Sequence, residues 1–333
     1  MATNPELFPA PCTYIEDFGG GFTRRAHGDG FRYLTVTGRP LRAAKTLARL
    51  QAIGLPPAYE QAWYCPSPRG HIQATGTDAA GRKQYRYHPA FRAEAEDVKF
   101  ASLAAFGAAL PRIRERVETD LARRDLSRDR VVAAVVRLLD TGHIRIGNRH
   151  YAQAPKSFGA TTLRNRHATV GRDKLRLEFT GKSGKAHSIT IADRRLASVV
   201  RQCQDLPGQQ LFQFVDDDGA RHAVTSGDVN NWLRQCCGDF TAKMFRTWHA
   251  SVIAFGALVE SDGQAKMRAA MDIVAAQLGN TPAVARKSYV HPAILDVLTG
   301  ERAWKAEWAK LPRAAQAMEP VERGFLAFLK STT

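Results

Sequence analysis

Four segments of the chain carry side chains whose types and order suit one kind of chemistry. They appear in the order HIRIGNRHY (143–151), FTGKSGK (179–185), FTAKMFRTW (240–248) and LGNTPAVARKSYVHP (278–292). Tyrosine supplies a phenol oxygen that can act as a nucleophile. Arginine stays charged at every relevant pH and binds phosphoryl oxygens in a bidentate manner. Together the segments indicate a phosphoryl-transfer site that works without a metal ion.

The positive charge of the chain is concentrated around these segments. The 333 residues contain 48 Lys and Arg against 32 Asp and Glu, a formal net charge of +16. Residues 145–187 hold half of that net charge, since ten basic residues stand there against only Asp173 and Glu178. Such an excess repels itself unless an anionic partner docks on it. The phosphate backbone of a nucleic acid is the first candidate.

Composition excludes several other classes of protein. The hydrophobic share of 44% and the charged share of 24% are those of a globular protein. No apolar run approaches the ~20 residues that span a bilayer, and the first residues show no secretory signal. The five cysteines lack C-x-x-C spacing, which argues against a disulfide scaffold and a zinc ribbon. We expect a cytoplasmic protein that does not enter a membrane.

The sequence supports neither a nucleotide-binding loop nor a two-metal site. Gly181-Lys182-Ser183 looks like the end of a phosphate-binding loop, but Arg176 stands where the leading glycine is needed. We therefore expect no nucleotide cofactor. Two-metal chemistry needs several clustered carboxylates, and the basic centre has only two. The acidic run at 216–219 is typical of a hairpin turn, so no metal site is predicted.

The elements that must position these segments fall into two predicted domains, 1–95 and 96–333. The first is rich in β-structure. Its expected elements are strands at 22–26, 31–37, 62–65, 71–75 and 83–88 and one helix at 41–53.

The second predicted domain is mostly helical with a small antiparallel sheet. Its expected elements are helices at 100–120 and, capped by Ser127, up to 139, followed by strands at 144–147, 174–180 and 187–191. Everything after Ala192 is expected to be helical, with caps at Ser226 and Thr241 and a break at Pro282, where Thr281 would cap a new helix. The layout is that of an α+β protein.

The ordered set of four segments resembles the catalytic signature of the type IB DNA topoisomerases, in particular the small bacterial and poxvirus-like branch. PRGHIQATGTDAAGRKQYRYHP (68–89) also resembles DNA-contacting strands of that family. The resemblance extends from about residue 20 to 292. It implies a clamp around duplex DNA and relaxation of supercoils through a 3′-phosphotyrosyl intermediate. It also implies that neither ATP nor an obligatory metal is used.

Carried over residue by residue, the resemblance makes Tyr289 the nucleophile and Arg145, Lys182 and Arg246 the cations of the site. Lys182 would serve as general acid for the departing 5′ oxygen, because an alkoxide is a poor leaving group. Each of these residues alone would be an ordinary packing residue or surface charge. It is their joint order and spacing that favours catalysis.

Asn280 departs from the pattern, since poxvirus and eukaryotic members carry a histidine there. Its amide can donate a hydrogen bond to a phosphoryl oxygen but has no titrating proton. Residues 279–282 equally fit an ordinary helix start. Both interpretations of Asn280 stay open.

Further residues are candidates for DNA contact. Gln84, Tyr85 and Tyr87 lie on a basic strand, Tyr151 matches a family position at the cleaved strand, and Lys243 precedes Arg246 by three residues. The strand tyrosines could instead pack inward, and Lys243 could be a solvated charge.

Two other functions fit parts of the pattern. A tyrosine recombinase uses the same nucleophile and cations, but it usually has a histidine where Lys243 stands. A non-catalytic DNA-binding clamp would not need the four intact residues. We expect a monomer acting at the bacterial nucleoid.

Overall fold

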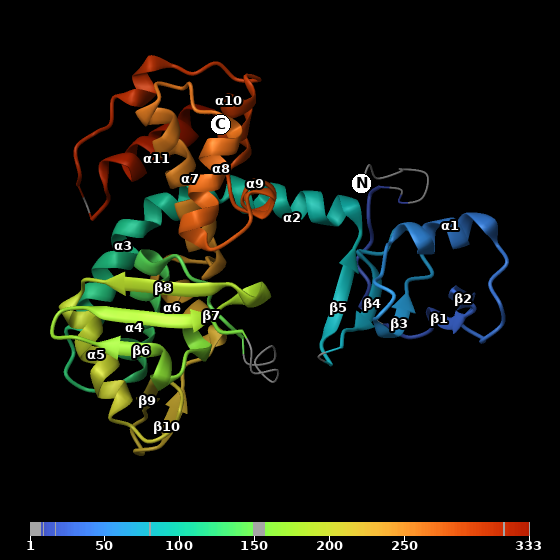
Figure 1. Ribbon diagram of the computed structural model, residues 1–333, viewed down its shortest axis with the longest axis horizontal. Helices are drawn as coiled ribbons and strands as arrows, with labels where there is room; N and C mark the ends of the chain where they lie inside the picture. The colour runs from blue at the N-terminus through green and yellow to red at the C-terminus, as the bar shows by residue number, and fades with distance from the viewer. Residues whose placement is uncertain are drawn as a thin grey trace. The chain divides into compact units, whose positions relative to one another are not determined.

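A computed structural model describes residues 8, 10–16, 18–79, 81–148, 157–315 and 317–332. The chain divides into two compact units, Met1–Val98 and Lys99–Thr333 (Figure 1). The helix α2 (Pro89–Ala101) contains the boundary between them.

The N-terminal unit is built on a five-stranded antiparallel sheet in the order β2-β1-β3-β4-β5. Its strands are β1 (Phe22–His27), β2 (Gly30–Leu34), β3 (Glu60–Tyr64), β4 (Ile72–Thr77) and β5 (Lys83–Tyr87). The helix α1 (Ala44–Ala52) contributes Leu50 to a small core with Tyr33, Tyr64 and Ala74. All five predicted strands and the predicted helix are present, but β2 ends at Leu34 rather than at 37 and α1 begins at Ala44 rather than at 41. The strand β5 forms one edge of the sheet.

The second unit consists mainly of helices packed around one large core. These are α3 (Leu103–Leu121), α4 (Arg128–Gly142), α5 (Arg194–Gln204), α6 (Ser226–Cys237), α7 (Lys243–Glu260), α8 (Met267–Leu278), α9 (Pro282–Ser288), α10 (Pro292–Thr299) and α11 (Pro320–Thr332). The helix α7 is buried along most of its length, and Trp248 on it packs against Phe106 and Phe325. Gly107 is required there, because a Cβ at that position would collide with the Trp248 ring.

A three-stranded antiparallel sheet covers part of this helical core. Its strands, in the order β6-β7-β8, are β6 (Ala168–Val170), β7 (Leu175–Thr180) and β8 (Ala186–Ile191). Along β7 the side chains of Leu175, Leu177 and Phe179 are buried and their neighbours are exposed, as the alternation in the sequence predicts. The β7–β8 turn carries Lys182 in a single 3₁₀ turn, Lys182–Gly184. The α+β class is confirmed.

Several local predictions for this unit were wrong. Residues 144–147 belong to no strand, and Gly147 has a left-handed backbone conformation (φ 83°). The carbonyls of Arg145 and Ile146 instead accept hydrogen bonds from the amides of Ala160 and Thr161, both at 2.8 Å. The region after Ala192 is not all helix, because β9 (Gln213–Val215) and β10 (Arg221–Ala223) form a hairpin there.

The turn of this hairpin is the acidic run 216–219, as predicted.

The structure confirms one of these three predicted helix caps and moves the other two by one residue. Thr225, one residue before the predicted Ser226, caps α6 in a reciprocal pair with Asp228. At α7 the cap residue is Ala242 rather than Thr241. Thr281 does cap α9, with Pro282 in the first helical position. None of the described helices is both long enough and apolar enough to cross a bilayer.

Candidate active site

Tyr289 lies at the end of α9, with its phenol oxygen facing two arginines. Arg145 Nη1 donates a hydrogen bond to Tyr289 Oη at 2.7 Å. The guanidinium carbon of Arg246 lies 5.1 Å from the centre of the Tyr289 ring. Arg145 and Arg246, which are 144 and 43 positions before Tyr289 in the sequence, therefore both lie against its side chain. The predicted site requires this proximity.

The backbone around Tyr289 is held by a serine that the sequence analysis did not single out. Ser251, fully buried on α7, donates to the Tyr289 carbonyl at 3.2 Å and accepts from the His291 amide at 3.0 Å. This places the end of α9 against α7, the helix that also carries Arg246. A buried serine five residues after a catalytic candidate leaves no distinctive sequence signal.

Arg246 is buried, with 4% of its surface exposed, and both of its terminal nitrogens are used on backbone carbonyls. Nη1 donates to His143 O, and Nη2 donates to Leu278 O at 3.0 Å. These carbonyls lie at the C-terminal ends of α4 and α8. Among the described residues its Nε, also buried, has no hydrogen-bond partner.

Arg145 lies three residues beyond the end of α4, which stops where His143 adopts a left-handed backbone conformation (φ 52°). The buried Ile144 anchors the chain here, so the next side chain reaches across the site. Besides its bond to Tyr289, Arg145 donates from Nη2 to Asn280 Oδ1 at 2.9 Å. Arg145 thus bridges the phenol and the amide.

Asn280 sits between α8 and α9, directly after Gly279, whose φ of 62° ends α8. Only 6% of Asn280 is exposed, and within the described chain its Nδ2 has no partner. A buried donor without an acceptor is rare in proteins, so Asn280 Nδ2 is a candidate donor to a ligand oxygen. Because its Oδ1 accepts from Arg145, the Asn280 side chain lies in the cluster around Tyr289.

The charges of the two arginines change the acidity of the phenol. Burial alone raises the pKa of Tyr289, but Arg246 and Arg145 together outweigh it, so that the pKa is lowered. Burial also lowers the pKa of Arg246 to about 10, which still leaves it charged at pH 7. The surroundings of Tyr289 therefore favour its ionised form, the phenolate.

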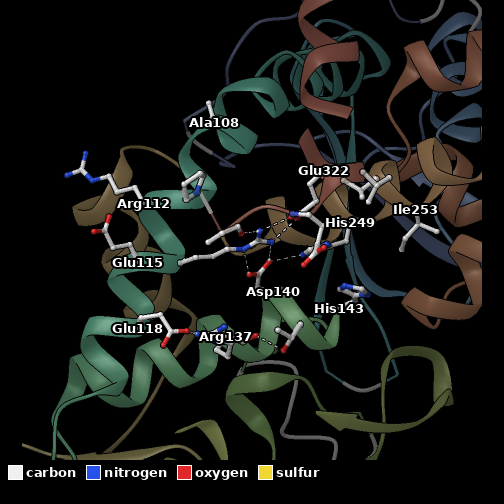
Figure 2. A pocket seen from close by; sticks show the side chains of 17 residues that line it. Ala108, Arg112, Glu115, Glu118, Arg137, Asp140, His143, His249, Ile253 and Glu322 are labelled. Atoms are coloured by element: carbon white, nitrogen blue, oxygen red, sulfur yellow. Dashed lines mark hydrogen bonds and ion pairs between the residues drawn. The ribbon is translucent and has the colours of Figure 1, made fainter. Parts of the chain in front are cut away.

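A buried network of charged side chains lines a pocket beside the end of α4 (Figure 2). Arg114 on α3 forms paired hydrogen bonds with Asp140 on α4 and with Glu322 on α11, at 2.8–3.0 Å. His249 Nε2 lies 2.9 Å from Asp140 Oδ1, and its ring lies 4.3 Å from that of His143. The network fixes the end of α4, which supplies both Arg145 and the carbonyl that holds Arg246.

Lys182 is the one predicted catalytic residue that the structure does not bring into this cluster. Its side chain is exposed in the β7–β8 turn and makes no hydrogen bond to any described residue. Lys185 of the same turn, which sequence reasoning missed, does reach the site and donates to Asn280 O at 2.5 Å.

The predicted DNA contacts lie at several places. Tyr85 and Tyr87 project from the edge strand β5 and are 43% and 42% exposed, so they do not pack inward. Gln84 donates to Asp78 at 2.9 Å. Lys243 is exposed at the start of α7. Tyr151 lies outside the described residues.

Comparison with known proteins places this fold and site in a family. The catalytic core of eukaryotic DNA topoisomerase I matches residues 88–312, and the N-terminal domain of bacterial DNA topoisomerase IB matches residues 30–78. The first match contains all five predicted catalytic residues. The chain belongs to the type IB DNA topoisomerase family, as the sequence resemblance predicted.

Individual relatives agree with this family. DNA topoisomerase 1B of Acanthamoeba polyphaga mimivirus is 30% identical over 285 residues, which cover 81% of this chain and 85% of the viral one. DNA topoisomerase 1B of vaccinia virus (strain Copenhagen) is 22% identical, covering 72% and 76%. Among solved structures, the XerH site-specific recombinase bound to difH substrate has a TM-score of 0.36 at 14% identity, over 58% of this chain and 53% of the recombinase.

Proposed function

We propose that this chain relaxes supercoiled DNA by cutting one strand, holding its 3′ phosphate on Tyr289, and resealing it after the free end has rotated. One observation carries the proposal. Tyr289 Oη accepts a hydrogen bond from Arg145, while two buried donors of the same site, Asn280 Nδ2 and Arg246 Nε, have no acceptor among the described residues.

The reaction is a transesterification. Tyr289 Oη forms a bond to phosphorus as its proton passes to solvent, and the bond from phosphorus to the 5′ oxygen breaks. The covalent phosphotyrosine conserves the energy of the broken ester, so that religation needs no nucleotide cofactor. The transition state gathers charge on the phosphoryl oxygens, where fixed donors stabilise it most.

Each polar group of the site has a part in this scheme. Arg145 and Arg246 neutralise the phosphoryl charge, and Asn280 Nδ2 donates to one of its oxygens. Lys182 gives a proton to the departing 5′ oxygen and becomes a neutral amine, which takes the proton back when the strand is resealed. Because Lys182 is exposed on a hairpin, DNA can reach its ammonium group directly.

DNA binding is proposed for both units. Residues 1–95 would form a DNA-binding domain that uses Gln84, Tyr85 and Tyr87, and residues 96–333 a catalytic domain that adds Tyr151 and Lys243. Exposed tyrosines on a basic edge strand suit contacts to phosphates and groove edges. We further propose that the two domains clamp duplex DNA and that the protein acts as a monomer at the bacterial nucleoid.

The first prediction concerns the nucleophile. Incubated with negatively supercoiled plasmid in EDTA without ATP, the protein should relax the plasmid, because its chemistry uses its own cations. Tyr289→Phe should bind duplex DNA with unchanged affinity and leave the plasmid supercoiled. Relaxation by the variant would refute the assignment of Tyr289. Strand exchange between defined sites without relaxation would identify a recombinase instead.

A further inference from the structure

The imidazole of His187 is wedged between two glycines that belong to two different turns. His187 lies on β8 with its ring parallel to that of Phe179, at an interplanar angle of 7° and a centroid distance of 4.9 Å. A Cβ on Gly181 would lie 2.6 Å from His187 Nε2, and one on Gly279 would meet Cε1 at less than 3.0 Å. No real Cβ approaches so closely, so the ring contacts both backbones.

Each of these glycines directly precedes a residue of the proposed machinery. Gly181 comes before Lys182 in the β7–β8 turn, and Gly279 comes before Asn280 in the α8–α9 turn. The two turns are joined at a second point, where Lys185 Nζ donates to Asn280 O at 2.5 Å. The hairpin is therefore attached to the Asn280 turn by one packed ring and one hydrogen bond.

We propose that His187 is a positioning residue that docks the Lys182 hairpin against the Asn280 turn, and so sets where the Lys182 ammonium meets the departing 5′ oxygen. The inference rests on the proposed role of Lys182 as general acid. His187 itself transfers no proton in this scheme.

The electrostatics of the ring agree with such a packing role. Burial, followed by the charges of Arg246, Arg145 and Lys185, lowers the pKa of His187. The ring is therefore neutral at pH 7 and adds no further positive charge to the site. A neutral ring can pack closely on two glycine backbones and on Phe179.

The first test compares two leaving groups in single-turnover cleavage. A 5′-phosphorothiolate leaves without a proton, so it bypasses the need for Lys182. On a normal phosphodiester, His187→Ala should lower the cleavage rate by about tenfold or more, part of the ~10²–10⁴ that general acids supply. On the phosphorothiolate its rate should return to that of the unchanged protein within about threefold, as should that of Lys182→Ala.

A double variant separates positioning from loss of fold. Lys182→Ala/His187→Ala should cleave the phosphodiester no more slowly than Lys182→Ala, because both changes remove the same contribution. His222→Ala, a change of an exposed histidine on the β9–β10 hairpin, should leave the rates unaltered. If His187→Ala melts at a lower temperature than the unchanged protein, His187→Gln, whose side chain still fills the space between the glycines, replaces it. Its cleavage rates on the phosphodiester and the phosphorothiolate are then compared in the same way.

A suppressor experiment tests the contact itself. Gly181 has φ −92°, which alanine adopts without strain, so Gly181→Ala should slow cleavage only because its methyl group meets the imidazole. In Gly181→Ala/His187→Ala the collision is absent, and the rate should equal that of His187→Ala. A double variant slower than His187→Ala would overturn the docking contact.

The outcomes distinguish this inference from the proposed function. If the phosphorothiolate rescues Lys182→Ala but not His187→Ala, the positioning role of His187 is wrong and the general acid stands. If neither is rescued, the general-acid assignment of Lys182 fails.

Discussion

The two arginines beside Tyr289 are held in different ways, and the difference bears on what each can do. Arg246 uses both terminal nitrogens on the carbonyls of His143 and Leu278, so its guanidinium is fixed before any substrate arrives. Arg145 instead bonds the side chains of Tyr289 and Asn280, the two groups that we propose to engage the phosphate. We infer that Arg246 is preorganised and that Arg145 exchanges partners when DNA binds.

At this scale the unpartnered amide of Asn280 yields a prediction. Removing one preorganised donor from a charge-developing site lowers the rate by about 10²–10³-fold. Asn280→Ala should therefore slow single-turnover cleavage by about that factor while duplex affinity stays within about twofold, since a single neutral donor adds little to backbone binding.

Asn231→Ala is the matched control, because Asn231 is on α6 and bonds only Arg234 among the described residues. An unchanged cleavage rate in Asn280→Ala would leave the residue as a helix-start asparagine and nothing more.

The helices α7 to α10 carry most of the residues of the site. The caps of the short helices α9 and α10 matter because such short helices are not stable on their own. Thr281 caps α9, and His291 caps α10 by accepting from Ala293 N at 3.1 Å. Burial, as the first cause, lowers the pKa of His291 to about 4. The cap therefore works only while the ring is neutral.

This yields a prediction for stability against pH. An unfolded histidine binds a proton near pH 6.5 and folded His291 only near pH 4, so between these values the unfolded chain binds more protons. The free energy of unfolding should fall as pH is lowered through this window, by up to about 1.4 kcal/mol per pH unit from this residue. In His291→Asn, which keeps a capping acceptor, urea denaturation should show a shallower fall.

Thr281→Asn changes the neighbouring cap without adding or removing a titrating group, so its pH slope should match that of the unchanged protein. An identical slope in His291→Asn would show that this histidine does not set the pH dependence.

The local sequence pattern predicted many of these helices and strands, but few of the tertiary contacts between them. The alternation along β7 and the Thr281-Pro282 start of α9 depend on neighbouring residues, and both predictions are confirmed. Residues 144–147 also looked like a strand, but the fold provides no partner strand there. The anchoring of Arg246 on carbonyls and the wedging of His187 depend on tertiary contacts between distant segments, which composition and spacing do not encode.

For the whole molecule, the dominant quantity is the net charge of +16 and its concentration in residues 145–187. A protein that neutralises several phosphates releases counterions, and its affinity then falls steeply with salt. The pairing of a basic catalytic unit with an edge strand of exposed tyrosines in the other unit favours broad contact with the backbone over reading of a short sequence.

The prediction at this scale uses Tyr289→Phe, so that binding is measured without cleavage. Between 50 and 200 mM salt, duplex affinity should fall by about 10³-fold or more, as for proteins with ~6–10 phosphate contacts. Fluorescence anisotropy over a salt series gives the slope directly. A nearly flat dependence would mean that the basic run does not lie on DNA, and the proposed clamp would fail.

The carbonyl anchors of Arg246 have an evolutionary consequence. Main-chain oxygens are present whatever side chain occupies positions 143 and 278, so drift at those positions cannot delete the acceptors. A side-chain substitution at position 143 or 278 therefore leaves both acceptors of Arg246 in place. A substitution of Tyr289 or Asn280, by contrast, removes a partner of Arg145.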